Sequence, residues 1–127
     1  MDSPLFSLGA PMHVTVDCLD PQRLARFWSG LTGQRVAHEE GPFVFLAGPS
    51  REATAMAFQQ VSEPTRGKNR VHVDFRTADL DGACAMVERL GGTLLDDHAE
   101  MGARWQVAAD PEGNVFCLVE AKSTARS

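Results

Sequence analysis

Two short segments of the sequence place chemically capable side chains at alternate positions. These side chains are His13, Thr15 and Asp17 in the first segment, and His72, Asp74 and Arg76 in the second. Successive side chains of a β-strand point to opposite faces, so in a strand each trio would share one face of a sheet. Imidazole is a common metal ligand, and His or Asp can act as an acid–base group. We therefore expect two polar sheet faces, with His13 and His72 as metal ligands or with Asp17, Asp74 or His72 as the catalytic group.

The two segments belong to an internal repeat. Residues 13–20 lie over residues 72–79 when the chain is shifted by 59 positions, and Gly33 then falls on Gly92. The residues that precede each glycine also agree in hydrophobic class. A repeat of this length indicates two copies of one supersecondary unit.

Each repeat opens with a strand and a helix. Residues 12–18 and 71–77 alternate as strands do. Asp20-Pro21 is typical of a helix start, and Gly33 and Gly91-Gly92 are typical of helix ends. Apolar residues at helical spacing (Leu24, Phe27, Trp28 and Leu31; Leu80, Ala83, Cys84 and Val87) predict one buried face for each helix.

Three further strands follow each predicted helix. We expect them at 34–38, 43–47 and 54–61, and at 93–96, 103–109 and 114–120. Residues 110–113 suit a type I turn. The prediction is an α+β fold of two βαβββ modules in a single domain over residues 1–121. Module one covers about 10–61, a linker covers 62–69, module two covers about 70–121, and 122–127 form a polar tail.

The net charge, the apolar runs and the cysteines of the sequence indicate which kinds of partner and which cellular location to expect. The 127 residues carry a net charge of −5, which disfavours nucleic acid as a partner. No apolar run has the length of a membrane span, and no secretion signal is evident at the N-terminus. Three cysteines without paired spacing suggest reduced thiols, so we expect a cytoplasmic protein.

The pattern resembles the vicinal oxygen chelate superfamily, which includes glyoxalases, extradiol dioxygenases and the fosfomycin and bleomycin resistance proteins. The resemblance rests on His13-x-Thr15, on Phe27-Trp28, on residues 70–74 (Arg-Val-His-Val-Asp) and on residues 110–114 (Asp-Pro-Glu-Gly-Asn). Among its members the chain looks most like small bacterial glyoxalase-like proteins. The resemblance implies two cupped sheets facing one another around a central pocket. It also implies a divalent metal held by the first and last strands of the modules, and a homodimer that sometimes exchanges modules.

The last strands depart from the family pattern. Cys117 stands where the family enzymes carry a glutamate, and Glu120 has the opposite strand parity. In module one Gln59 or Gln60 is the nearest polar candidate, and we prefer Gln59. Two histidines and a thiolate could hold zinc. If Cys117 instead packs against the helix, the metal hypothesis fails.

The sequence is compatible with two functions. The first is a sequestering or resistance-type protein that binds a small organic molecule without metal, in a pocket that we expect to include Thr15, Asp17, Asp74, Arg76 and Trp105. The second is a lyase, isomerase or transferase dependent on Zn, Ni, Mn, Co or Fe(II).

Several polar side chains have alternative interpretations. Arg76 either pairs with Asp74 and Asp17 or holds a ligand carboxylate or phosphate. Trp105 either stacks on a ligand or packs in the barrel. His38 and His98 lie in polar, loop-like settings in the sequence, and we expect both side chains to be exposed.

Overall fold

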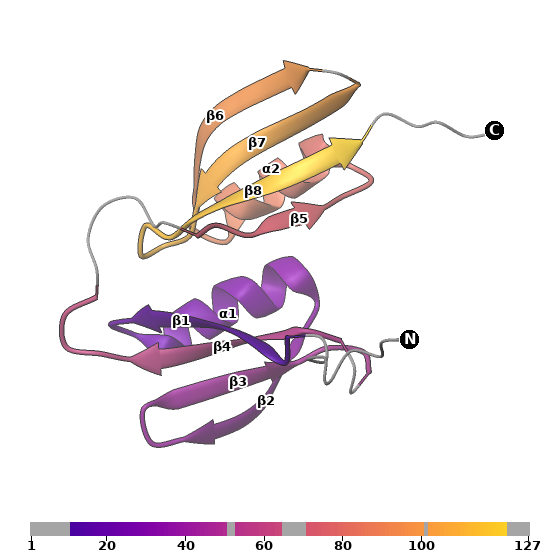
Figure 1. Ribbon diagram of the computed structural model, residues 1–127. Helices are drawn as coiled ribbons and strands as arrows, with labels where there is room; N and C mark the ends of the chain where they lie inside the picture. The colour runs from indigo at the N-terminus through magenta and orange to yellow at the C-terminus, as the bar shows by residue number, and fades with distance from the viewer. Residues whose placement is uncertain (1–10, 51–52, 65–70, 101, 122–127) are drawn as a thin grey trace, which may run out of the picture.

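The computed structural model describes residues 11–50, 53–64, 71–100 and 102–121, which form two four-stranded sheets with one helix each (Figure 1). Module one comprises β1 (His13–Cys18), α1 (Pro21–Thr32), β2 (Arg35–Glu40), β3 (Phe43–Ala47) and β4 (Ala55–Gln60). Its strand order is β1-β4-β3-β2, with β1 parallel to β4 and the other pairs antiparallel.

Module two repeats this topology. It comprises β5 (Asp74–Arg76), α2 (Leu80–Arg89), β6 (Thr93–Glu100), β7 (Ala103–Ala109) and β8 (Val115–Ala121), in the order β5-β8-β7-β6. The predicted α+β fold of two βαβββ modules is confirmed. The predicted strand at 71–77 is shorter than expected, because its ladder with β8 begins only at Asp74. Residues 65–69 of the predicted linker and the predicted tail at 122–127 lie outside the described residues.

The helix boundaries follow from local chemistry. The Asp20 carboxylate accepts a hydrogen bond from the Arg23 amide at 3.1 Å, and Pro21 occupies the first turn. Gly33 ends α1 with a φ of 80° and donates its amide to the Ser29 carbonyl at 2.9 Å. Asp79 caps α2 in the same way, through the Gly82 amide at 3.0 Å.

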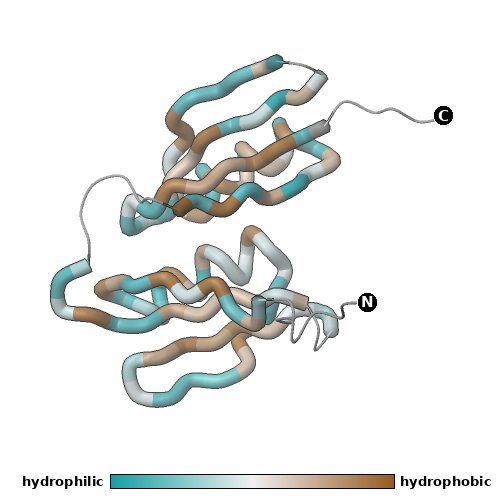
Figure 2. Tube along the Cα trace, in the orientation of Figure 1, coloured by the Kyte–Doolittle hydropathy of each residue, from teal (hydrophilic) through white to brown (hydrophobic). Residues whose placement is uncertain are grey.

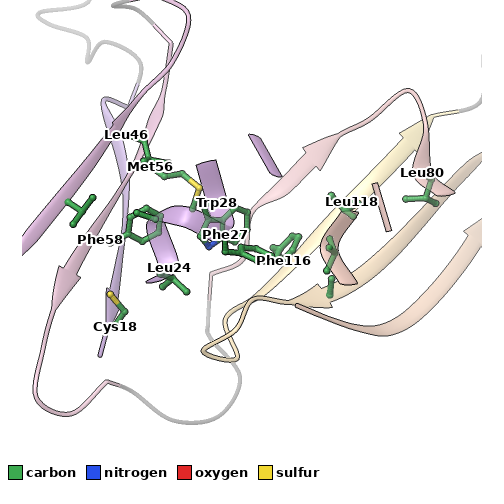
Figure 3. Close-up of a cluster of buried hydrophobic side chains, with 14 residues drawn as sticks. Cys18, Leu24, Phe27, Trp28, Leu46, Met56, Phe58, Leu80, Phe116 and Leu118 are labelled. Atoms are coloured by element: carbon green, nitrogen blue, oxygen red, sulfur yellow. The ribbon is translucent and has the colours of Figure 1, made fainter. Parts of the chain in front are cut away.

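One hydrophobic core joins the two modules (Figure 3). Trp28 of α1 contacts Phe75 and Phe116 of module two, with ring centroids 5.4 Å and 4.6 Å apart. The same helix covers Val44, Leu46, Met56 and Phe58 of its own sheet. The apolar faces of both sheets therefore turn toward a shared core that contains α1.

The loop between β7 and β8 fastens the modules together. The Asp110 carboxylate is buried, since Asp110 is only 3% exposed. It accepts a hydrogen bond from the indole N–H of Trp28 at 3.0 Å. Glu112 accepts hydrogen bonds from the amides of Leu19 and Asp20 at 2.8 and 2.9 Å. Gly113 closes the predicted turn by donating its amide to the Asp110 carbonyl at 2.8 Å.

This packing leaves the helix-free face of each sheet turned away from the shared core. We call these the module-one face (helix-free side of β1–β4) and the module-two face (helix-free side of β5–β8). Among the described residues of one chain the helix-bearing sides of the sheets meet, so the two helix-free faces do not face one another as the resemblance implies. The outer strands β2 and β6 are largely hydrophilic (Figure 2). None of the described helices is long and apolar enough to cross a membrane.

Candidate functional site

The module-two face brings three potential metal ligands together. Asp74 of β5 pairs in register with Cys117 of β8, so both side chains point to the same side. The ligand atoms of His72, Asp74 and Cys117 all lie within 4.8 Å of one another. The Nε2 atom of His72 lies 3.3 Å from a carboxylate oxygen of Asp74. His72 and Asp74 are exposed, whereas Cys117 is 8% exposed.

Strand parity explains which candidates join this group. Cys117 lies on the helix-free side, since it shares its register with Asp74 and its neighbour Leu118 belongs to the shared core. Glu120 lies on the opposite side, where it accepts a hydrogen bond from the Leu80 amide at 3.0 Å and pairs with Arg104 at 3.3 Å. Glu120 therefore caps α2 and cannot replace the thiol of Cys117 on the module-two face.

The donor types suit a borderline metal better than a hard one. Zinc accepts imidazole nitrogen, carboxylate oxygen and thiolate sulfur, and catalytic zinc sites often use three protein ligands with one open position. Magnesium and calcium prefer oxygen ligands throughout. The group at His72, Asp74 and Cys117 thus fits zinc, or cobalt in its place.

The module-one face has no matching set of donors at His13. His13 pairs in register with Ala55, and Ala57 occupies the position equivalent to Cys117, beside Thr15. Gln59 lies on the same face but next to Asp17, two pairs further along. His13, Thr15 and Asp17 are all exposed, as the alternation predicts. The ligand group found among the described residues does not include His13.

Aromatic rings cover part of the module-one face. Phe45 of β3 contacts three neighbouring rings, those of His13, His38 and Phe43, with centroid separations of 5.4, 6.1 and 5.7 Å. His38 also lies 3.1 Å from the Glu40 carboxylate. Sequence reasoning missed Phe45 and Phe43, although their alternation with the buried residues Val44 and Leu46 marks them as sharing one face.

A second stacked pair lies on the module-two face. The rings of His98 and Trp105 are nearly parallel, with centroids 5.1 Å apart. His38 and His98 are exposed as expected, but they lie in the strands β2 and β6 and not in loop-like settings. Both strands continue through exposed charged residues toward a hairpin turn. The His-x-Glu alternation at 38–40 and 98–100 was the available signal.

Arg76 projects from the module-two face without the predicted ion pair. Among the described residues it forms no salt bridge with Asp74 or Asp17, and Asp17 belongs to the other face. Of the two interpretations of Arg76, the geometry leaves its guanidinium available to a ligand carboxylate or phosphate.

The other two cysteines lie on the helix side and stay protonated at neutral pH. Burial, together with the carboxylates of Glu112 and Asp110, raises the pKa of Cys18 to about 12. Burial, followed by the charge of Asp81, also raises the pKa of Cys84 above its ordinary value. Neither thiol shares a face with the ligand group.

Comparison with known proteins agrees with this architecture. A family model described as a glyoxalase-like domain matches residues 13–119. No curated protein matches the chain.

Solved structures with a similar fold come from several bacteria. A glyoxalase/bleomycin resistance protein/dioxygenase family enzyme from Burkholderia phytofirmans PsJN has a TM-score of 0.74 at 18% identity, covering 87% of this chain and 97% of its own. The fosfomycin resistance protein FosX from Mesorhizobium loti has a TM-score of 0.72 at 19% identity, with coverages of 94% and 97%. TnmS3, an antibiotic binding protein from Streptomyces sp. CB03234, has a TM-score of 0.72 at 18% identity, with coverages of 92% and 99%.

These identities establish the shared fold alone, whereas the family model covers most of the sequence. The chain belongs to the glyoxalase-like domain family, within the vicinal oxygen chelate fold.

Proposed function

We propose that this protein binds a small organic molecule on its helix-free sheet faces, as a sequestering or resistance-type protein. The observation that carries the proposal is the character of these faces. In the described part of a single chain, both faces combine exposed polar groups with stacked rings. Such a mixture suits an organic ligand with a planar part and a few polar groups. Two structural neighbours are described as a fosfomycin resistance protein and an antibiotic binding protein, which supports this class of ligand.

The same proposal includes a homodimer. A ligand pocket normally buries most of its ligand, and neither face can do so alone. A second copy could place its module-two face over the module-one face, and the twofold operation would repeat the arrangement. Thr15, Asp17, Asp74, Arg76 and Trp105 would then line two equivalent pockets. Sedimentation equilibrium tests this assembly, and Phe45→Asp should shift the chain toward the monomer.

The two tryptophans provide a direct test of ligand binding. Trp105 lies on the module-two face, whereas the indole N–H of Trp28 is held in the core by Asp110. In ¹H–¹⁵N spectra, titration with bleomycin or fosfomycin should move the indole signal of Trp105 and leave that of Trp28 in place. The proposal fails for these ligands if neither compound moves the Trp105 signal, or if both indole signals move together.

A metal-dependent enzyme is the second candidate, because one specific observation favours it. His72, Asp74 and Cys117 converge as a nitrogen, oxygen and sulfur donor set. A bound zinc, nickel, manganese, cobalt or iron(II) ion would act as a Lewis acid on a substrate oxygen. In that case the chain would be a lyase, isomerase or transferase. In the proposed dimer the module-one face of the second copy would cover the metal site. Asp17 of that face would be the acid–base candidate, and His13 of that face would be a further metal ligand.

Cobalt distinguishes these two candidates without an activity assay. Bound Co²⁺ should give a thiolate charge-transfer absorption that Cys117→Ser removes and that His72→Ala weakens. Cys84→Ser is the matched control, since its thiol lies on the helix side and should leave the absorption unchanged. The metal-dependent candidate is excluded if the wild-type protein shows neither this absorption nor a rise in Tm with Co²⁺ or Zn²⁺.

We also propose a cytoplasmic location. No disulfide joins these three described cysteines (Cys18, Cys84 and Cys117), and reduced thiols persist in a reducing compartment.

A further inference from the structure

A cavity lies beside α2 in module two and reaches the edge of the module-two face, because His98 and Trp105 also line it. It has a volume of about 330 Å³ and opens between the first half of α2 and the hairpin formed by β6 and β7. Leu80, Cys84 and Leu94 supply apolar surface, and Asp81, Asp97 and Arg104 supply charge. The alternation along β7 places Gln106 on this side, because it contacts Cys84 of α2.

The internal repeat shows why the cavity exists. Val44 of β3 pairs in register with Phe58, just as Gln106 of β7 pairs with Leu118. Val44 is 1% exposed in a packed core, so module one fills the equivalent space with apolar side chains. On α2 the position equivalent to Leu24 is occupied by Ala83, which is smaller. Module two therefore replaces a packed helix–sheet contact with a partly polar hollow.

The polar wall of this cavity is held in place by hydrogen bonds. Gln106 is 8% exposed, and its amide N–H groups donate to the carbonyls of Asp96 and Val107 at 3.0 and 2.9 Å. Its amide oxygen lies 3.9 Å from the thiol of Cys84. Because the amide is fully engaged, it fixes the shape of the cavity instead of competing for a ligand.

Of the charged side chains that line the cavity, the Asp97 carboxylate is the one that can accept a ligand cation. Arg104 is engaged by Asp81 at 3.2 Å and by Glu120 at 3.3 Å. Asp97 lines the cavity and forms no salt bridge within the described part of the chain. The balance at this site is therefore negative, and the thiol of Cys84 stays neutral because burial raises its pKa.

We propose that this cavity is a second ligand site, which takes a small organic ammonium compound. The apolar body would lie against Leu80, Leu94 and Cys84, and the ammonium group would reach the Asp97 carboxylate. Anions are disfavoured, since Arg104 already has two carboxylate partners. The site shares His98 and Trp105 with the module-two face, and variants at Asp97 and Cys84, which lie on the helix side, separate it from the function proposed for that face.

We use benzylamine to test binding of an ammonium compound in this cavity, and benzyl alcohol as an uncharged compound of similar size and shape. Benzylamine should bind more tightly than benzyl alcohol, with amide shifts in ¹H–¹⁵N spectra centred on Cys84, Leu94 and Asp97. Asp97→Asn should weaken benzylamine about fivefold, as expected for an exposed ion pair, and leave benzyl alcohol unchanged. Asp96→Asn is the matched control, because it removes the same charge from the adjacent residue, which does not line the cavity.

A cavity-filling variant tests the location in a different way. Cys84→Leu adds side-chain volume inside the cavity and should abolish the binding of both compounds. If that variant does not fold, the two aspartate variants still decide the question. The proposal is overturned if benzylamine binds no better than benzyl alcohol, if Asp96→Asn weakens it as much as Asp97→Asn, or if its shifts centre on the module-two face.

Discussion

The two helices occupy equivalent places in their modules but differ in how deeply they are buried. α1 buries Pro21, Leu24, Ala25, Phe27 and Trp28. α2 buries only Leu80 and Val87. The difference arises because α1 packs against its own sheet and also contacts Phe75 and Phe116 of module two. The molecule is therefore asymmetric in its core, although its topology is a repeat.

Side-chain size along the repeat accounts for this asymmetry. Leu24 corresponds to Ala83 and Trp28 corresponds to Val87 under the shift of 59 residues. Larger side chains on α1 supply the shared core, while smaller ones on α2 leave the cavity beside it. The ligand group at His72, Asp74 and Cys117 lies in module two as well. A repeat can thus keep one topology while the helix of one copy is the more deeply buried and the other copy holds the ligand group and the cavity.

The largest expected effect comes from Trp28. Trp28→Ala should lower the free energy of unfolding by about 3–5 kcal/mol, because it removes a buried ring and leaves the buried Asp110 carboxylate without its indole donor. Val87→Ala, at the equivalent position of α2, should cost about 2 kcal/mol. Urea unfolding followed by far-UV circular dichroism measures both values. Equal losses at the two positions would refute the asymmetry of the core.

The buried thiol of Cys18 predicts a pH dependence. Its pKa is about 12 in the folded protein, against an ordinary value of 9.0. Above pH 9 the unfolded chain loses this proton while the folded protein keeps it, so stability falls as pH rises. The slope approaches about 1.4 kcal/mol per pH unit above pH 10, which gives about 1.6 kcal/mol between pH 9 and 10.5.

A matched pair of variants assigns this slope to its residue. Urea unfolding from pH 8 to 10.5 should show a shallower dependence for Cys18→Ala than for the wild type. Cys84→Ala should remove less, since Cys84 is only half-buried. The chain contains no tyrosine, so phenol ionisation does not add to the signal. A slope unaffected by Cys18→Ala would contradict the assignment.

The features that were predictable from sequence depend on neighbouring residues. Asp20 and Gly33 mark the ends of α1 through local capping, and alternation along β1 separates His13 from Val14. The exposure of Thr15 and the burial of Trp28 follow from the same periodicities. Each of these predictions needs only the geometry of a single strand or helix.

The features that escaped prediction depend on distant pairing. Trp28 and Asp110 are 82 positions apart, and only the packing of the two modules brings them together. His72 and Cys117 were already candidate ligands, but the approach of Asp74 to both of them requires the parallel register of β5 with β8. The cavity results from the side-chain volumes of α2, β6 and β7 together, and the sequence pattern of a single element does not predict it.

The last pair of variants, which includes the smallest expected effect, tests how closely α1, α2 and β7 approach one another at Gly92. A Cβ atom there would lie 2.7 Å from Val87 Cγ1, 2.8 Å from the Ala109 carbonyl oxygen and 3.0 Å from Phe27 Cε1. Gly92→Ala should therefore destabilise the protein by about 1–3 kcal/mol, because the backbone oxygen cannot move aside.

Gly30 provides the contrasting case on α1. The three atoms nearest to a Cβ there all belong to the Leu90 side chain, with its methyl groups at 3.0 and 3.1 Å, and this flexible side chain can shift. Alanine also favours a helix over glycine by up to about 1 kcal/mol, so Gly30→Ala should change stability by no more than about 0.5 kcal/mol. Thermal unfolding of both variants separates the two cases. If Gly92→Ala proved as mild as Gly30→Ala, the close approach of α1, α2 and β7 at this point would be refuted, and with it the shared core that turns the two polar faces outward.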